Sequence, residues 1–166
     1  MTESHTGTKT VASSGRTIDE VRVALASVPD DMTRLIEGKT GDDLMRPAND
    51  GGWGIVEIAP HFRDWEAVIA NRVSRILGED GPDLEEYDDT LWAIEHDYRS
   101  QDPREAIAEF RKLREALVDK VSALPDPEWL RTATIPKRGM ITLHWLLNNL
   151  CDHDAKHLMQ SRDVLA

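Results

Sequence analysis

The sequence predicts an all-α domain, organised as a four-helix bundle with long crossover connections. Two observations predict this class. Four segments of roughly 20 residues carry apolar side chains at three- and four-residue spacing, which gathers them on one face of a helix. Alternating runs of the kind that form half-buried strands are missing. Amphipathic helices bury such faces most economically against one another in a bundle.

Composition and charge exclude several kinds of partner. The chain has 166 residues, the size of one domain with a sizeable core, and a formal net charge of −11. That charge argues against nucleic-acid backbones and anionic membranes, which attract basic surfaces. No apolar run approaches the roughly 18 residues of a membrane span, and no secretory signal pattern is present. The single cysteine, Cys151, fits a reducing compartment, so we expect a cytoplasmic protein.

The first segments are a tail and a capped helix. Residues 1–16 are rich in Thr, Ser and Gly, which predicts a flexible N-terminal tail, and residues 17–166 are predicted to form the bundle. Thr17 and the carboxylate three residues later fit a capping box, so the first helix is predicted to begin there. Pro29 lies inside this helix, where it removes a backbone hydrogen bond and predicts a kink or break.

The second helix is predicted from about Gly54 to Leu77, with Gly78 as its stop signal. His61 flanks the apolar stripe near the start of this helix and is therefore able to face inward. Pro60, directly before it, lies beyond the first turn and predicts a bend or a delayed start. Taken alone, His61 is more readily interpreted as a hydrogen-bonded boundary histidine than as a metal ligand.

A long acidic connection is predicted over residues 79–100, with a short helix within residues 88–99. Asp102 then provides a cap and Pro103 a first helical position, which predicts the start of the third helix. Pro125 ends that helix, because proline removes the backbone donor that the next turn needs.

The last part of the chain is predicted to be irregular over residues 128–140 and helical from Thr142 to about Val164. The connections between the four helices are about 15–25 residues long, more than an up-and-down bundle needs. At least one of them is therefore expected to cross over, which leaves some neighbouring helices parallel.

The fourth helix carries a pair of histidines on its buried stripe. Leu143, Leu146 and Leu150 lie on the same helical face as His153 and His157. Side chains four residues apart are roughly 6 Å apart on a helix, so both imidazoles are able to bind one ion. The spacing alone is weak evidence for a metal site. Burying an imidazole without a partner is costly, however, so the position of the pair on the buried stripe strengthens the prediction.

Neighbouring helices pack about 8–10 Å apart, so the second helix is able to add His61 to the pair on the fourth helix. Residues 53–66 read Trp-Gly-Ile-Val-Glu-Ile-Ala-Pro-His-Phe-Arg-Asp-Trp-Glu, and residues 151–160 read Cys-Asp-His-Asp-Ala-Lys-His-Leu-Met-Gln. The first stretch resembles the second-helix signature of the DinB/YfiT-like superfamily, in which a Trp-Ser-x-x-Glu opening precedes a ligand histidine and an Asp-x-Glu. The second is similar to the His-x-x-x-His motif of its fourth helix. The resemblance extends from about Val21 over nearly the whole chain.

This resemblance implies a four-helix bundle of the DinB/YfiT type, with one divalent metal ion bound by His61, His153 and His157. It also implies a metal-dependent hydrolase, or a transferase that uses a low-molecular-weight thiol such as mycothiol or bacillithiol. Similar proteins often pair as homodimers, and the oligomeric state of this chain is left open. Two positions depart from the pattern: Gly54 stands where the family has Ser or Thr, and Pro60 replaces an aliphatic residue.

Three imidazoles leave one coordination position open for water, thiolate or substrate, which is typical of catalytic rather than structural sites. Such a ligand set accepts zinc, nickel or ferrous iron. Asp64, three residues after His61, is the candidate carboxylate behind a ligand or the candidate base. Asp152, Asp154 and Glu57 are further candidates behind the ligands. The alternative interpretation of each carboxylate is that it lies on a solvated helix face and has no role at the metal.

Other chemically capable side chains are given structural interpretations. His144 lies about 180° round the helix from His153 and is excluded from the site. His96 is interpreted as a surface histidine near the pocket mouth, and Cys151 as a packed thiol. The aromatic side chains that are able to line a pocket, but are more readily assigned to the core, are Trp53, Trp65, Trp92 and Trp145.

Two classes of function remain open at this stage. The first is a metalloenzyme, either a thiol-dependent transferase or a hydrolase, acting on a small molecule. The second is a metal-binding bundle with a stress-response role and no turnover, because the sequence offers no clear general base. A role on DNA is disfavoured by the acidity of the chain.

Overall fold

The computed structural model describes residues 15–166. The predicted N-terminal tail therefore lies outside the described residues, apart from Gly15 and Arg16. Arg16 Nη1 donates to Asp152 Oδ1 at 2.8 Å, which attaches the start of the described chain to the last helix. None of the described helices combines the length and the apolar character that crossing a membrane requires.

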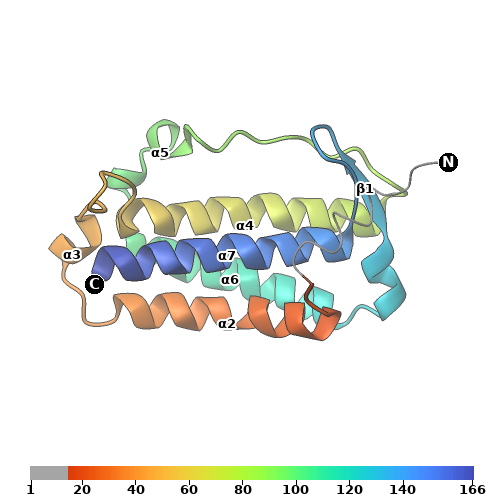
Figure 1. The fold of residues 1–166 in the computed structure, drawn as a ribbon, viewed down its shortest axis with the longest axis horizontal. Coiled ribbons are helices and arrows are strands. Elements are labelled where there is room, and N and C mark those ends of the chain that lie inside the picture. The colour runs from red at the N-terminus through yellow and green to blue at the C-terminus, as the bar shows by residue number, and fades with distance from the viewer. Residues whose placement is uncertain (1–14) are drawn as a thin grey trace.

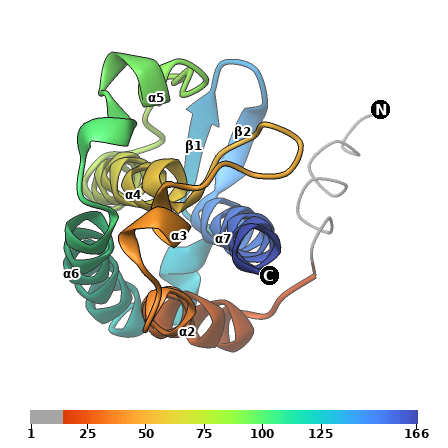
Figure 2. The ribbon, with the colours of Figure 1, turned by 90° about the vertical axis from the view of Figure 1, so that its left-hand side faces the viewer.

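Four long helices form the bundle, as the sequence predicts (Figure 1). They are α2 (Ile18–Ile36), α4 (Ile55–Gly78), α6 (Pro103–Ser122) and α7 (Leu143–Leu165). Seen along their axes, α2 and α4 lie diagonally opposite each other, and each packs against both α6 and α7 (Figure 2). Helices α4 and α7, which carry the three candidate ligands, are therefore direct neighbours.

The connection between α4 and α6 is the predicted crossover. It returns along the length of the bundle from the end of α4, so α4 and α6 are adjacent and run in the same direction (Figure 1). Helices α2 and α7 are the second parallel pair. The crossover contains the short helices α5 (Trp92–Glu95) and η1 (Tyr98–Ser100), which lie over the end of the bundle where α4 begins.

Local capping explains why the long helices begin where they do. Thr17 and Glu20 form the predicted capping box, since each side chain bonds the backbone N–H of the other residue at 3.1 and 2.9 Å. Asp102 accepts from the N–H of Arg104, and Thr142 accepts from that of Trp145. These caps confirm the predicted starts of α2, α6 and α7. Helix α2 continues through Pro29 without a break.

The connections hold more structure than the sequence predicts. A short helix, α3 (Gly41–Met45), lies between α2 and α4. The prediction that residues 128–140 are irregular is wrong, because they include most of the 3₁₀ helix η2 (Asp126–Leu130) and of an antiparallel hairpin. Its strands are β1 (Thr132–Ile135) and β2 (Gly139–Thr142). Backbone bonds between Thr134 and residues 82 and 84 attach the start of the crossover to this hairpin.

The apolar core is divided in two by a layer of buried charge. One apolar cluster includes Ile69, Leu117 and Leu147, and the other includes Phe62 and Phe110. Between them, in chain order on each helix, lie three charged side chains that are almost completely buried: Glu66 on α4, Arg114 on α6 and Asp154 on α7.

Candidate metal centre

The structure brings the three predicted ligands together. His61 on α4 and His153 and His157 on α7 offer ring nitrogens that all lie within 4.8 Å of one another. The Nε2 atoms of His61 and His153 are 2.9 Å apart. Two nitrogen lone pairs at that distance repel each other, so the two rings must share either a proton or a cation.

Burial keeps His61 and His157 in the neutral form that binds metal. Removal from water, with smaller contributions from the neighbouring His153 and His157 rings, lowers the pKa of His61 from 6.5 to about 3. Burial, and to a smaller extent the neighbouring His153 ring, lowers the pKa of His157 to about 4. Metal ligands must be deprotonated, so a site with these pKa values is prepared for an ion at neutral pH.

The start of α4 is shaped so that His61 reaches this point. Gly54 is the N-cap residue, and its N–H donates to Glu57 Oε1 at 3.0 Å. A Cβ atom on Gly54 would lie 2.1 Å from the carbonyl oxygen of Arg46. Glycine replaces the Ser or Thr of the family pattern here because the preceding loop approaches too closely to leave room for a side chain. Pro60 lies within a continuous helix, and His61 still meets the other two histidines.

The three histidines form one wall of an open pocket of about 420 Å³. Its other lining residues are Trp53, Asp89, Thr90, Lys156 and Gln160. Lys156 and Gln160 are not among the residues predicted from the sequence, although each lies three residues after a ligand histidine on the same helix. Asp89 and Thr90 come from the crossover, and no local sequence pattern predicts the path of the crossover over α4.

Asp64 lies beside the site and anchors the crossover. The hydroxyl of Tyr98 donates to Asp64 Oδ2 at 2.7 Å, and Nδ1 of the half-exposed His96 lies 3.1 Å from the same oxygen. Arg63 Nε donates to Asp64 Oδ1 at 2.9 Å. Burial raises the pKa of the Asp64 carboxyl, but these hydrogen bonds outweigh it and the pKa falls below its usual range. Its oxygens are occupied by these donors, and Asp64 does not line the pocket.

The other predicted carboxylates have different partners. Glu57 bonds the N–H of Gly54 at the start of α4, and Asp152 pairs with Arg16 at the surface. Asp154 is the carboxylate that faces a ligand from behind: its Oδ1 lies 3.6 Å from Nδ1 of His153.

Two further side chains lie away from the site, as the sequence predicts. His144 Nε2 lies 2.8 Å from the carbonyl oxygen of Arg16, and its ring contacts Trp129. Cys151 is buried, and that burial raises the pKa of its thiol to about 11. A thiol with that pKa is inert at neutral pH, which agrees with a packing role.

Arg114 joins the charged layer to all four helices. Its guanidinium donates twice to Glu66, at 2.7 and 2.8 Å, and to Asp154 Oδ2 at 2.9 Å. Arg114 Nη1 also donates to the carbonyl oxygen of Leu25 at 3.1 Å. That carbonyl has no helical donor four residues on, because residue 29 is proline. The missing bond in α2 is thus replaced by a side chain from α6.

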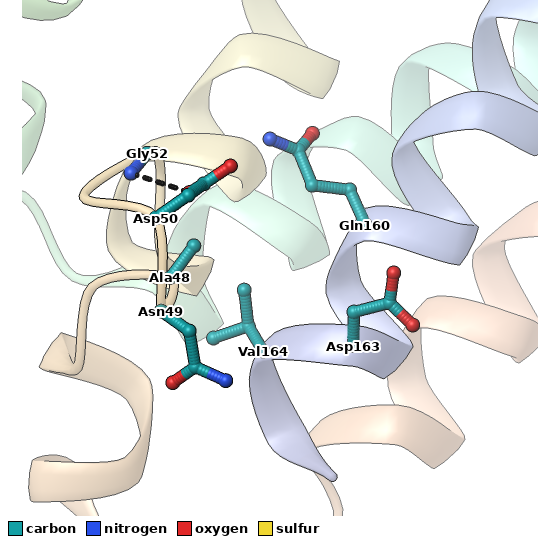
Figure 3. A pocket seen from close by; sticks show the side chains of 7 residues that line it. All are labelled: Ala48, Asn49, Asp50, Gly52, Gln160, Asp163 and Val164. Carbon is teal, nitrogen blue, oxygen red and sulfur yellow. Dashed lines mark hydrogen bonds between the residues drawn. The ribbon is translucent and has the colours of Figure 1, made fainter.

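A second pocket, of about 260 Å³, lies beside the last turns of α7 (Figure 3). The loop before α4 forms its other wall, where Gly52 N–H donates to Asp50 Oδ1 at 2.9 Å. Gln160 borders both pockets. Among residues 15–166, the three histidines form the group of His, Cys, Asp or Glu side chains that is close enough to hold a metal ion.

Comparison with known proteins assigns the family. Residues 24–161 match the DinB superfamily, which is most of the chain. The chain belongs to the DinB superfamily. This membership confirms the resemblance seen in the two histidine segments.

Relatives of this DinB-superfamily chain carry the name "putative metal-dependent hydrolase". YfiT of Bacillus subtilis is 26% identical over 135 residues, which cover 81% of this chain and 76% of YfiT. A protein of Geobacillus thermodenitrificans is 28% identical over 83 residues, or 50% of this chain and 47% of its own length. The solved structure of YfiT, described as having "an unusual four-helix bundle topology", superposes with a TM-score of 0.82 at 24% identity. The superposition covers 89% of this chain and 85% of YfiT, and it supports the shared fold.

Proposed function

We propose that this DinB-superfamily protein is a metal-dependent hydrolase of a small molecule, with one divalent ion held by His61, His153 and His157. The observation that carries the proposal is the meeting of three imidazoles, two buried and one half-buried, within 4.8 Å of one another at an open pocket. The donor set fits such an ion, because three neutral imidazoles bind zinc, nickel or ferrous iron and leave a position for another ligand. The names of the relatives support the same activity.

The chain supplies the groups that bind and orient the substrate. When bound, a divalent ion lowers the pKa of a water or thiol ligand and polarises an adjacent carbonyl. Lys156 offers a positive charge to an anionic part of the substrate, and Thr90 offers a hydroxyl. The carboxylate of Asp89 lines the same pocket and is able to accept a proton. Trp53 packs against the rings of His61 and His157 and excludes water from that side.

A thiol-dependent transferase of the mycothiol or bacillithiol type is the second candidate. It is favoured by the pocket volume of about 420 Å³, which admits a small organic thiol as well as water. A metal-binding bundle without turnover is the third candidate, and it is disfavoured because a purely structural ion needs no open pocket. We keep the cytoplasm as the proposed compartment and a homodimer as the proposed assembly.

Elemental analysis tests the ligand set. After loading with zinc, nickel or ferrous iron, we expect about one ion per wild-type chain and a large loss in His157→Ala, because chelation needs all three imidazoles. His144→Ala is the matched control, since it removes a histidine from the opposite face of the same helix. A wild-type chain that retains no ion under any of these conditions contradicts the proposal.

Activity assays separate the candidates. The metal-loaded protein is assayed for hydrolysis of a panel of esters and amides, and in parallel for consumption of thiols by electrophiles such as epoxides. A hydrolase turns over the first panel, loses that activity with a chelator, and has no activity in His157→Ala. Turnover of the thiol panel alone assigns the transferase, and tight metal binding without turnover of either panel assigns the third candidate.

A further inference from the structure

The hydrogen-bond contacts of the three histidine rings single out Nε2 as the inward nitrogen of each. The Nε2 atoms of His61 and His153 face each other at 2.9 Å, and Nδ1 of His157 is 2.8 Å from Gln160 Oε1, which leaves its Nε2 as the free nitrogen. The two remaining Nδ1 atoms also face oxygens. Nδ1 of His153 lies 3.6 Å from Asp154 Oδ1, and Nδ1 of His61 lies 3.8 Å from Asp89 Oδ2.

We propose that Asp89 is a positioning residue of the metal centre, which accepts a hydrogen bond from Nδ1 of His61 when an ion is bound. Gln160 Oε1 already lies within hydrogen-bond distance of Nδ1 of His157, and Asp154 Oδ1 lies 3.6 Å from Nδ1 of His153, so an oxygen lies behind each of the three ligands. This inference rests on the proposed function. It makes the crossover part of the metal centre, although no residue of the crossover is among the three ligands.

The proton balance at His61 requires such an acceptor. An ion held by both Nε2 atoms leaves the ring proton of each neutral imidazole on Nδ1. Nδ1 of His61 is buried and has no hydrogen-bond partner among the described residues. Leaving a buried donor without an acceptor is unfavourable, and the outer nitrogen of a metal-bound histidine almost always donates to an oxygen. The carboxylate that faces this nitrogen is that of Asp89.

The surrounding contacts hold Asp89 over His61 and leave it room to approach. Asp88 Oδ1 accepts from both the N–H and the hydroxyl of Thr90, at 3.1 and 2.6 Å, which shapes the turn that carries Asp89. The Asp89 side chain is 34% exposed, so it is not locked by packing. An approach of about 1 Å brings its oxygen within hydrogen-bond distance of Nδ1. Asp154, by contrast, is fixed by Arg114.

Zinc affinity, measured by competition with a chromophoric chelator, tests the role of Asp89. We expect Asp89→Ala to bind zinc about 10–100-fold more weakly than wild type. Asp89→Asn keeps an acceptor oxygen and is expected to stay within about threefold of wild type. Glu95→Ala is the matched control, because it removes one negative charge from the exposed face of the same crossover. Unfolding in urea checks that all three variants remain folded.

Nitrogen-15 spectra of the histidine rings in the zinc-loaded protein give a second readout. A protected Nδ1 proton on His61 is expected in wild type and Asp89→Asn, and its loss is expected in Asp89→Ala. Equal zinc affinity in Asp89→Ala and wild type overturns the inference. So does an Asp89→Asn variant as weak as Asp89→Ala, because the charge or a direct bond to zinc would then be the cause. Absence of zinc binding in wild type counts against the proposed function instead.

Discussion

Arg114 is completely buried between two carboxylates and a backbone carbonyl, far from the water that normally solvates a guanidinium. Burial lowers its pKa, but Asp154 and Glu66 outweigh that effect and raise it, so the side chain stays charged. Replacing a whole buried ion network with apolar groups is often tolerated, whereas removing one member leaves uncompensated charge. The contribution of Arg114 is therefore best measured by deleting it alone.

Arg114→Met is expected to lower the free energy of unfolding by about 3–5 kcal/mol, because it leaves Glu66 and Asp154 without a cation. Urea unfolding followed by circular dichroism measures the loss. Arg111→Met on the same helix is the control: Arg111 pairs with Asp30 near the surface, and such pairs contribute about 1 kcal/mol or less. Equal effects of the two substitutions contradict this account of the charged layer.

The histidine pKa values predict how stability depends on pH in the metal-free protein. In the unfolded chain both rings have a pKa near 6.5, while in the fold the pKa is about 3 for His61 and about 4 for His157. The unfolded state binds more protons below pH 6.5, so stability is full above that pH and is lost as the pH falls toward 4. The free energy of unfolding is expected to change with pH by at most about 1.4 kcal/mol per pH unit for each histidine.

Urea unfolding at pH 7.5, 6.0 and 5.0 with a chelator present measures this slope. The double variant His61→Gln with His157→Gln removes both titrating rings and is expected to show a clearly flatter profile. A wild-type profile that stays flat over this interval means that the two rings are as exposed to protons in the fold as in the unfolded chain.

Individual residues differ in how far the sequence predicts them. His153 and His157 are predictable because histidines four residues apart on a buried stripe carry a local signal, whereas His61 is predicted only through the family resemblance. Arg114 and Glu66 are not, since charged side chains on an amphipathic helix are usually solvated and only tertiary packing encloses them. Asp89 is not predictable either, because its position over His61 depends on the path of the crossover.

Helix α4 shows how one element depends on its neighbour. Family resemblance suggests Ser at position 54, which as an N-cap residue is normally better than Gly. Here the carbonyl of Arg46 occupies the space that any side chain would need. The capping bond comes from Glu57 instead, and Gly54 permits the contact between the loop and the helix.

Gly54→Ser is therefore expected to destabilise the protein by about 1–3 kcal/mol, the usual cost of overpacking, in spite of the better cap. Gly78→Ala is the control at the other end of the same helix, where nothing lies within 4 Å of the added Cβ atom. That change is expected to be neutral or to stabilise by up to about 1 kcal/mol. Thermal unfolding of both variants decides the matter, and a stabilised Gly54→Ser would refute the steric account.

At the scale of elements, the sequence predicts the long helices well because their caps and apolar spacing are local. Helix α3 and the hairpin β1–β2 are missed. Each strand of the hairpin has four residues, which is too short for alternation to be distinguished from loop. The hairpin is fixed instead by its bonds to residues 82 and 84 and by Gly139, whose φ of +84° suits the turn.

The whole molecule has negative charge both on its surface and inside it. The chain has a net charge of −11, and the buried layer of Glu66, Arg114 and Asp154 has two carboxylates for one guanidinium. Burial raises the pKa of the Glu66 carboxyl, which reflects the cost of removing a carboxylate from water. Asp154 joins the layer to His153, so a divalent cation at the three histidines compensates the excess charge.

Zinc at about 100 times its dissociation constant is expected to raise the free energy of unfolding by about 2.7 kcal/mol. For a chain of this size that corresponds to an increase of about 5–10 °C in Tm. Calorimetry with and without zinc measures the shift, and His157→Ala is expected to show little of it. A shift of equal size in that variant means that zinc acts at other sites on the acidic surface.

His61 and His153 are separated by 92 residues, and the last long helix supplies two of the three imidazoles. During synthesis, a ribosome-bound chain that has not yet released α7 carries a single one of them, and one imidazole alone holds a divalent ion weakly. Tight binding of the ion therefore requires a chain in which α7 has been synthesised and has folded against α4. Chains cut short or clipped before residue 153 stay metal-free, and a protease that attacks loosely folded chains is able to tell the two populations apart.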